Sequence, residues 1–150
     1  GGGIYPVSAF LARADVMEVF NPGSHGSTFG GNPLAAAIGI EALNIMAEEK
    51  LSERSAKLGA YVMDELRKID TNLITEIRGA GLWIGIDIDP EIASARAICE
   101  ELKTRGLLCK ETHETVVRLA PPLTITKEDI DWALGHIREV ITLMEQKAAA

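Results

Sequence analysis

The chain has little of several features that would assign it to a special class of protein. Only 5 % of its residues are aromatic, and only two of the 150 are cysteines, Cys99 and Cys109. The two cysteines form no C-x-x-C pair and have no histidine cluster beside them, which argues against a zinc site or a disulfide framework. We expect two buried thiols in a protein of the reducing cytoplasm.

Long apolar runs and clusters of positive charge are also missing. The most apolar stretch, residues 35–40, is broken by Glu41 and falls far short of the roughly 20 residues of a membrane-spanning helix. The net charge of −7 gives an acidic surface, which repels phosphate backbones. We therefore expect neither a membrane-embedded protein nor a nucleic-acid partner. The opening Gly1-Gly2-Gly3 lacks an initiating Met and any signal peptide, and predicts a piece of a longer protein.

What is present is the composition of an ordinary globular protein. Hydrophobic residues make up 47 % and charged residues 25 % of a chain long enough to bury a core. Charged residues are sparse before residue 50 and frequent after it. This change predicts a boundary, with one part over residues 1–50 and another over 51–150.

The first part is expected to hold little regular structure apart from one long helix. Residues 4–12 are apolar and predict a buried strand, and residues 14–20 predict a short helix. Glycine and proline make residues 21–33 a loop. Asn32 followed by Pro33 predicts the start of a helix to about residue 49. That helix is apolar nearly all round, so we expect it to be buried on several sides, either in a core or in a subunit interface.

The second part shows alternating helix and strand patterns. An amphipathic helix is expected first, then two strands around a Gly79-Ala80-Gly81 turn, a helix that Asp89-Pro90 begins, two further strands, and a last helix capped by Thr126. The expected ranges are 52–69, 73–78, 82–88, 91–105, 107–110, 115–119 and 127 onward. The order α-β-β-α-β-β-α predicts a small sheet with helices on one face, an α+β layer.

The loop over residues 21–33 has the composition of an anion site. It carries the hydroxyls of Ser27 and Thr28 and leads into a helix N-terminus, where free backbone N–H groups and the helix dipole favour negative charge. It is not a Walker A loop, because no Gly-Lys-Ser/Thr follows. Taken alone, this composition is more typical of a glycine-rich connector with capping hydroxyls.

Four segments resemble, in the same order, the class-III aminotransferases of fold type I, which use pyridoxal phosphate (PLP). Residues 25–34 (HGSTFGGNPL) resemble the family signature H-G-[ST]-T-[FY]-G-G-N-P-L, and residues 1–8 resemble the stretch that follows its PLP-binding lysine. Residues 78–82 (RGAGL) resemble its R-G-x-G-L turn, and residues 117–123 (VRLAPPL) its substrate-arginine segment. The resemblance implies an α/β architecture: residues 1–50 would be a remnant of the large PLP-binding domain and residues 51–150 the C-terminal small domain.

The resemblance also implies roles for three residues. Ser27 and Thr28 would contact the PLP phosphate of the neighbouring subunit, which implies a homodimer. Arg118 would hold the α-carboxylate of glutamate or 2-oxoglutarate, a task that suits the guanidinium fork. From the residues alone, an arginine at a strand end before Pro-Pro, as Arg118 is, is more typical of a surface ion pair. For Arg78 we expect only a structural role at a strand end and tight turn.

The chemical centre implied by the resemblance is not in this chain. The family lysine that binds PLP covalently would stand a few residues before Gly1, and the acid and aromatic residue that hold the PLP ring would lie further upstream. None of the seven lysines matches that position. We therefore assign no catalytic residue and expect the isolated chain to be inactive. His25, His113 and His136 are not expected to be acid–base groups, and Asp87 and Asp89 suggest a helix cap rather than a carboxylate pair.

Two segments indicate a branch of the family. Residues 23–27 (GSHGS) and 110–113 (KETH) resemble the ornithine-specific members more than the acetylornithine-specific ones. This implies transfer of the δ-amino group of L-ornithine to 2-oxoglutarate, giving glutamate-5-semialdehyde and glutamate. A member acting on acetylornithine or 4-aminobutyrate, and a non-catalytic folding or dimerisation module, remain as alternatives.

Overall fold

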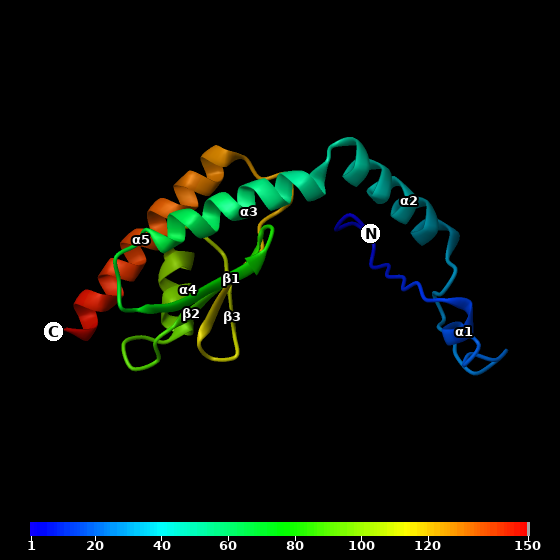
Figure 1. Ribbon diagram of the computed structural model, residues 1–150, viewed down its shortest axis with the longest axis horizontal. Helices are drawn as coiled ribbons and strands as arrows, with labels where there is room; N and C mark the ends of the chain where they lie inside the picture. The colour runs from blue at the N-terminus through cyan, green and yellow to red at the C-terminus, as the bar shows by residue number, and fades with distance from the viewer. Residues whose placement is uncertain (150) are drawn as a thin grey trace. The chain divides into compact units, whose positions relative to one another are not determined.

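The computed structural model describes residues 1–149 of the chain. It divides the chain into two compact units, Gly1–Lys50 and Leu51–Ala150. The first unit contains the helices α1 (Ala14–Met17) and α2 (Pro33–Glu48), and every strand of the described chain belongs to the second unit (Figure 1). Within residues 1–149, no helix combines the length and the apolar character that crossing a bilayer would require.

The strand predicted over residues 4–12 is wrong. These residues form no regular structure, and their apolar side chains are exposed, with Ile4 at 81 % and Leu11 at 99 %. A strand is held by backbone hydrogen bonds to a neighbouring strand. No neighbour exists among the described residues of this unit, so the apolar pattern alone cannot produce a ladder.

Helix α2 begins where the sequence predicts. The Asn32 side chain accepts hydrogen bonds from the backbone N–H groups of Leu34 (2.9 Å) and Ala35 (3.3 Å), and Pro33 occupies the first turn. Burial in a core of this unit is excluded, because among the 16 residues of α2 only Ala35 is buried, and burial in a subunit interface stays a prediction. Leu43 on the same helix is 66 % exposed. The apolar surface of α2 thus has no cover within the described unit.

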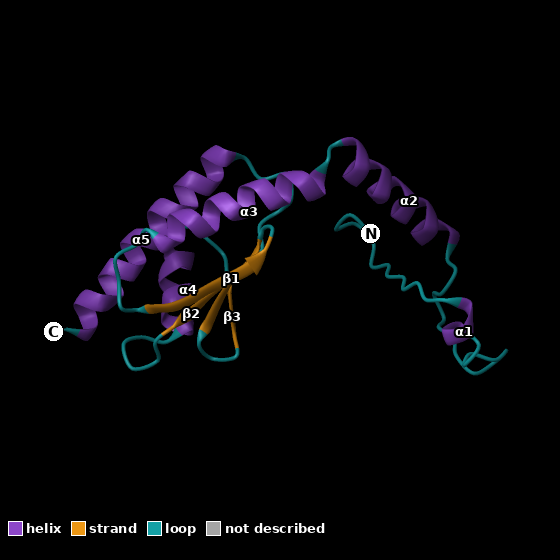
Figure 2. Ribbon diagram, in the orientation of Figure 1, coloured by secondary structure: helices purple, strands orange, loops and turns teal. Residues whose placement is uncertain are grey.

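The second unit is a four-stranded antiparallel sheet with three helices, which confirms the predicted fold class. The strands lie in the order β1-β2-β4-β3, so the two hairpins are joined through the central pair β2 and β4. Figure 2 shows the strands of this unit in orange and its helices in purple. The elements are α3 (Leu51–Arg67), β1 (Ile74–Ala80), β2 (Trp83–Ile88), α4 (Ala95–Thr104), β3 (Lys110–Thr112), β4 (Val116–Leu119) and α5 (Lys127–Ala148).

One face of the sheet carries the core. On β2 the residues Ile84, Ile86 and Ile88 are each at most 2 % exposed, and they pack with side chains of the three helices. The stripe predicted for α5 is buried as expected, from Ile130 to Met144. Because side chains alternate along a strand, Gly85 and Asp87 face the other side. That outer face lies away from the helices.

Several element boundaries differ from the prediction. Helix α4 begins at Ala95, where the Ser94 side chain accepts a hydrogen bond from the N–H of Ala97 (3.1 Å). Asp89 instead closes a short turn by accepting from the N–H of Glu91 (2.9 Å). Strand β3 starts only at Lys110, because pairing with β4 rather than local apolar content sets its ends. The Thr126 cap of α5 is confirmed.

A close backbone approach explains the glycines of the turn between β1 and β2. Gly81 has a φ of +58°, and a Cβ added to Gly59 of helix α3 would lie only 2.0 Å from the Gly81 carbonyl oxygen. Ser55 on the same helix accepts a hydrogen bond from the N–H of Leu82 (3.0 Å). The glycines therefore let α3 lie directly on this turn.

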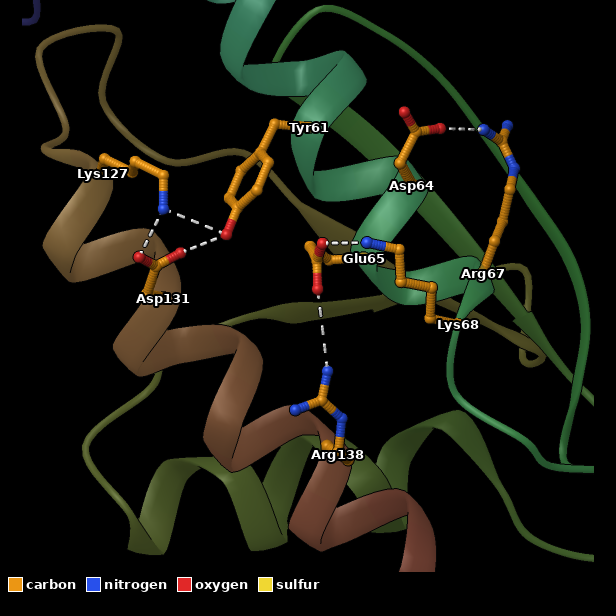
Figure 3. A network of polar contacts seen from close by, with 8 residues as sticks. All are labelled: Tyr61, Asp64, Glu65, Arg67, Lys68, Lys127, Asp131 and Arg138. Atoms are coloured by element: carbon orange, nitrogen blue, oxygen red, sulfur yellow. Dashed lines mark hydrogen bonds and ion pairs between the residues drawn. The ribbon is translucent and has the colours of Figure 1, made fainter.

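Helices α3 and α5 are also joined by polar contacts at the surface (Figure 3). The Tyr61 hydroxyl donates to Asp131 (2.6 Å), and the Lys127 ammonium donates to both Asp131 (2.6 Å) and the Tyr61 hydroxyl (3.1 Å). All three side chains are solvent-accessible, so these contacts orient the two helices more than they stabilise the fold.

Candidate functional site

The hydroxyl groups of Ser27 and Thr28 lie exposed in the loop that precedes α2. The loop is shaped by its own backbone: Ser24 exchanges hydrogen bonds with Asn21, and the N–H of Gly30 donates to the Ser27 carbonyl (3.2 Å). Neither hydroxyl makes a hydrogen bond to another described residue. Both remain able to donate to a ligand.

The backbone N–H groups at the start of α2, which were expected to be free for an anion, are already bonded within the chain. Asn32 already accepts from Leu34 and Ala35, its carbonyl accepts from the N–H of Ala36 (3.0 Å), and Pro33 has no N–H. The first turn of α2 thus has no unpaired donor. Donors remain in the loop itself, because the N–H groups of residues 26–29 bond to no other described group. An anion would be held by these groups and the two hydroxyls.

Arg118 lies in β4, on the outer face of the sheet, where it is half-buried. Its direct cross-strand neighbours are Gly85 on β2 and Lys110 on β3. Among the arginines of residues 1–149, it is the one whose guanidinium makes no hydrogen bond or ion pair with the described chain. The fork of Arg118 is therefore available to a carboxylate from outside.

Arg78 differs from Arg118 in this respect. It lies inside β1, two residues before the strand ends, and its guanidinium pairs with Asp87 and with Glu76 (3.0 Å). The hydrogen bond to Asp87 raises the pKa of Arg78 above its usual value. The structural role expected for Arg78 is thus an ion-paired position within the sheet.

The histidines are held by local contacts and show no catalytic arrangement. His25 packs against Phe20 with ring centroids 5.7 Å apart, and His136 packs edge-on against Trp132 at 4.7 Å. His113 sits in the β3–β4 turn with a φ of +51°. Within residues 1–149 no three His, Cys, Asp or Glu side chains gather as metal ligands.

The chain is similar to known proteins in both sequence and structure. The model of the family "Aminotransferase class-III" matches residues 1–141. The chain belongs to the class-III aminotransferases. Ornithine aminotransferases of Staphylococcus carnosus and Geobacillus sp. are 58 % and 56 % identical to it over 142 and 140 residues, covering 95 % and 93 % of this chain. The chain spans 35 % and 34 % of the length of these two curated relatives.

Solved aminotransferases share the fold. The ornithine delta-aminotransferase of Plasmodium falciparum superposes with a TM-score of 0.91 at 43 % identity, over 97 % of this chain and 39 % of that one. An acetylornithine aminotransferase of Elizabethkingia anophelis superposes with a TM-score of 0.84 at 48 % identity, over 94 % of this chain and 38 % of that one. The ornithine aminotransferase of Toxoplasma gondii, whose structure shows partial occupancy of PLP at its active site, superposes with a TM-score of 0.91 at 41 % identity, over 99 % of this chain and 35 % of that one.

Class-III aminotransferases use PLP, and this chain fits one part of that cofactor. The exposed hydroxyls of Ser27 and Thr28 and the N–H groups beside them are suitable donors for a phosphate. When bound, PLP supplies the electron-withdrawing ring on which an amino group is transferred. The first unit contains no lysine before Lys50, which stands at its very end.

Sequence reasoning missed which residues stand beside Arg118. The signal was available in part: β3 and β4 form a hairpin in which Thr112 pairs with Val116, so Lys110 must pair with Arg118. It also missed an apolar groove of about 620 Å³ in the second unit, lined by residues such as Leu107, Pro121 and Trp132.

Proposed function

We propose that these residues are part of an ornithine aminotransferase, a PLP enzyme that transfers the δ-amino group of L-ornithine to 2-oxoglutarate. The products would be glutamate-5-semialdehyde and glutamate. The observation that carries the proposal is the identity of 52–58 % to curated relatives of that name, over 93–97 % of this chain.

Arg118 is the residue we assign to the substrate carboxylate. Its guanidinium lacks a partner within the described chain and lies on an open sheet face, as a carboxylate clamp requires. A bidentate guanidinium–carboxylate contact fixes both the position and the orientation of a small acid. Arg118 would thereby hold glutamate or 2-oxoglutarate by the α-carboxylate while the other end of the molecule reacts.

Ser27 and Thr28 are the residues we assign to the PLP phosphate of a neighbouring subunit in a homodimer. Their unpaired hydroxyls and the exposed apolar surface of α2 support this proposal. The covalent attachment of PLP would depend on a lysine outside these 150 residues. Two free thiols, Cys99 and Cys109, support a cytoplasmic protein.

A second candidate is an acetylornithine aminotransferase. One specific observation favours it: the Elizabethkingia anophelis acetylornithine enzyme is 48 % identical to this chain, above the 43 % of the Plasmodium falciparum ornithine enzyme. Both substrates present an amino group to be transferred and are distinguished at the opposite end of the molecule. Relative kcat/KM for ornithine and acetylornithine decides between the two.

The test uses a chimera, defined as the Staphylococcus carnosus enzyme with its matching 142-residue segment replaced by this chain. We expect activity with ornithine and 2-oxoglutarate. Arg118→Ala should lower kcat/KM for 2-oxoglutarate by about tenfold to several hundredfold, because a charge-assisted hydrogen bond and an unpaired carboxylate are involved. Arg118→Lys should recover only part, since an ammonium cannot bind bidentately.

Thr28→Ala provides the matched contrast in the same chimera. It should weaken PLP retention during dialysis and leave the KM for 2-oxoglutarate nearly unchanged once PLP saturates the protein. An unchanged KM for 2-oxoglutarate in Arg118→Ala would contradict the clamp. Arg118 would then be a surface residue whose loss costs less than about 1 kcal/mol.

A further inference from the structure

We propose that Lys110 is a second cation of the carboxylate subsite at Arg118, on the outer face of the sheet, and that Glu111 controls it. The proposal rests on the proposed function for Arg118. It assigns to Lys110 a direct contribution to the affinity for the substrate carboxylate, and to Glu111 an opposing one.

The position of Lys110 follows from the strand register. Arg78, Gly85, Arg118 and Lys110 stand directly opposite one another across β1, β2, β4 and β3. Directly paired residues of antiparallel strands project from the same face, with Cβ atoms about 4.5–5.5 Å apart. The four residues therefore form one row across the outer face, with three cationic side chains and one gap.

The gap is Gly85, which has cationic neighbours on both sides. A Cβ at this position would lie 3.3 Å from a methyl group of Val116 and 3.9 Å from Cγ of Arg78. Because Gly85 has no side chain, no group of residue 85 projects between Arg78 and Arg118, and only the Val116 methyl group and the Arg78 stem border this position. A carboxylate bound by the Arg118 fork can therefore lie against the sheet, within the same row as Lys110.

The charges along the row are balanced unequally. Arg78 is neutralised by Asp87 and Glu76, whereas Arg118 has no acidic partner among the described residues. Like charges directly opposite each other on a sheet are unfavourable. Lys110 facing Arg118 therefore adds positive potential where Arg118 is already unneutralised, which favours an incoming anion.

Glu111 limits that effect. The Lys110 ammonium donates to Glu111 Oε1 at 3.3 Å, and the same carboxylate lies 3.4 Å from the Arg96 guanidinium. Lys110 is 64 % exposed in its side chain and lies on the edge strand β3, so its ammonium can move between Glu111 and a ligand at Arg118. A bound carboxylate and Glu111 thus compete for Lys110.

Four variants are made in the chimera: Lys110→Met, Lys110→Arg, Glu111→Gln and the double variant Lys110→Met/Glu111→Gln. The readouts are the KM for 2-oxoglutarate and the inhibition constant of glutarate, an unreactive dicarboxylate. Lys110→Met should raise both by about threefold to tenfold, and Lys110→Arg should stay within about twofold. Glu111→Gln should lower both by about twofold, and the double variant should match Lys110→Met because Glu111 acts through Lys110.

Lys103→Met is the control, because Lys103 pairs with Glu100 on helix α4 and carries the same charge away from the row. It should leave both constants unchanged. Equal effects of Lys110→Met and Lys103→Met would overturn the inference while leaving the proposed function intact, provided that Arg118→Ala still weakens 2-oxoglutarate. If Arg118→Ala has no effect, the proposed function fails as well.

A second measurement serves if the chimera does not retain PLP. The 150-residue chain itself is titrated with glutarate and followed by NMR at the Arg118 side-chain N–H and the β3 amides. Both sets of signals should shift together as glutarate is added. Lys110→Met should weaken the apparent affinity for glutarate by the same threefold to tenfold, and the tenfold limit corresponds to about 1.4 kcal/mol of binding free energy. Unperturbed signals at both places in the unsubstituted chain would overturn the inference.

Discussion

The two units of this chain are similarly rich in apolar residues and use them in opposite ways. In the second unit the apolar side chains of three helices meet one face of the sheet and are buried. In the first unit, among the described residues, only Ala35 reaches the same degree of burial, while Phe10, Leu11 and Leu43 are largely exposed. An apolar pattern thus indicates that a surface needs to be covered. Whether it is buried within the unit depends on a complementary apolar face in the same unit.

The largest expected effect follows directly from the exposed surface of the first unit. Isolated apolar side chains are normal at a protein surface, but a contiguous set drives association. We expect the 150-residue chain to self-associate and to bind a hydrophobic dye strongly. Replacing Ile40 and Leu43 together by Glu should reduce both signals, measured by light scattering and dye fluorescence. A monodisperse monomer without dye binding would contradict this expectation.

The second prediction makes one substitution in each unit. Leu66 on α3 is 1 % exposed and Leu43 on α2 is 66 % exposed. Leu66→Ala should lower the free energy of unfolding by about 2–5 kcal/mol, since it removes buried methyl groups and leaves a cavity. Leu43→Ala should change it by less than about 0.5 kcal/mol. Urea unfolding followed by circular dichroism measures both, and similar losses would show that the first unit also has a core.

The contrast also explains how much of the fold could be predicted. Helix α5 was predicted correctly because a cap at Thr126 and a stripe of the right period are both local features. The strand over residues 4–12 was not, because a strand requires a partner that the sequence of the segment does not contain. The start of β3 was shifted for the same reason, since pairing with β4 fixes it.

The candidate site, like the fold, was predictable only in those parts that depend on local sequence. Arg118, Ser27 and Thr28 stand in segments that resemble a family, so their identity could be read without the structure. The cap of α2 could also be read, because Asn32 followed by Pro33 is typical of a helix start in which the Asn side chain accepts from the first turn. The pairing of Lys110 with Arg118 depends on the hairpin register and became evident only in the sheet.

The third prediction tests the contact by which α3 lies on the β1–β2 turn. Gly59→Ala should destabilise the second unit by about 1–3 kcal/mol, because the added methyl group would overlap the Gly81 carbonyl and force the helix away. Gly135→Ala on α5 is the matched control, with no atom within 4 Å of the added methyl group. Gly135→Ala should stabilise the second unit by up to about 1 kcal/mol, because Ala has a higher helix propensity than Gly. Thermal unfolding compares them, and equal behaviour would contradict the close contact.

The smallest predicted effect concerns Glu145, which ties the end of α5 to the segment before β1. Its Oε1 atom accepts hydrogen bonds from the Thr71 hydroxyl (2.6 Å) and from the N–H groups of Asn72 (2.8 Å) and Leu73 (3.2 Å). These contacts lower the pKa of Glu145, the Thr71 hydroxyl contributing most. The ionised carboxylate is therefore the form that the folded state prefers.

The dependence on pH follows from this lowered pKa. The stabilisation by Glu145 should be fully present above its ordinary pKa of 4.5 and be lost as the pH falls through the lower pKa of the folded state. Glu145→Gln should thus cost about 1 kcal/mol at pH 7, and the cost should shrink steadily below pH 4.5. Glu91→Gln is the control, because the Glu91 side chain makes no hydrogen bond to the described residues. Urea unfolding of the unsubstituted chain, Glu145→Gln and Glu91→Gln between pH 3 and 7 measures how the free energy of unfolding differs among them. A cost of Glu145→Gln that stays constant down to pH 3 would mean that the charge of Glu145 contributes nothing and that only its shape holds the segment.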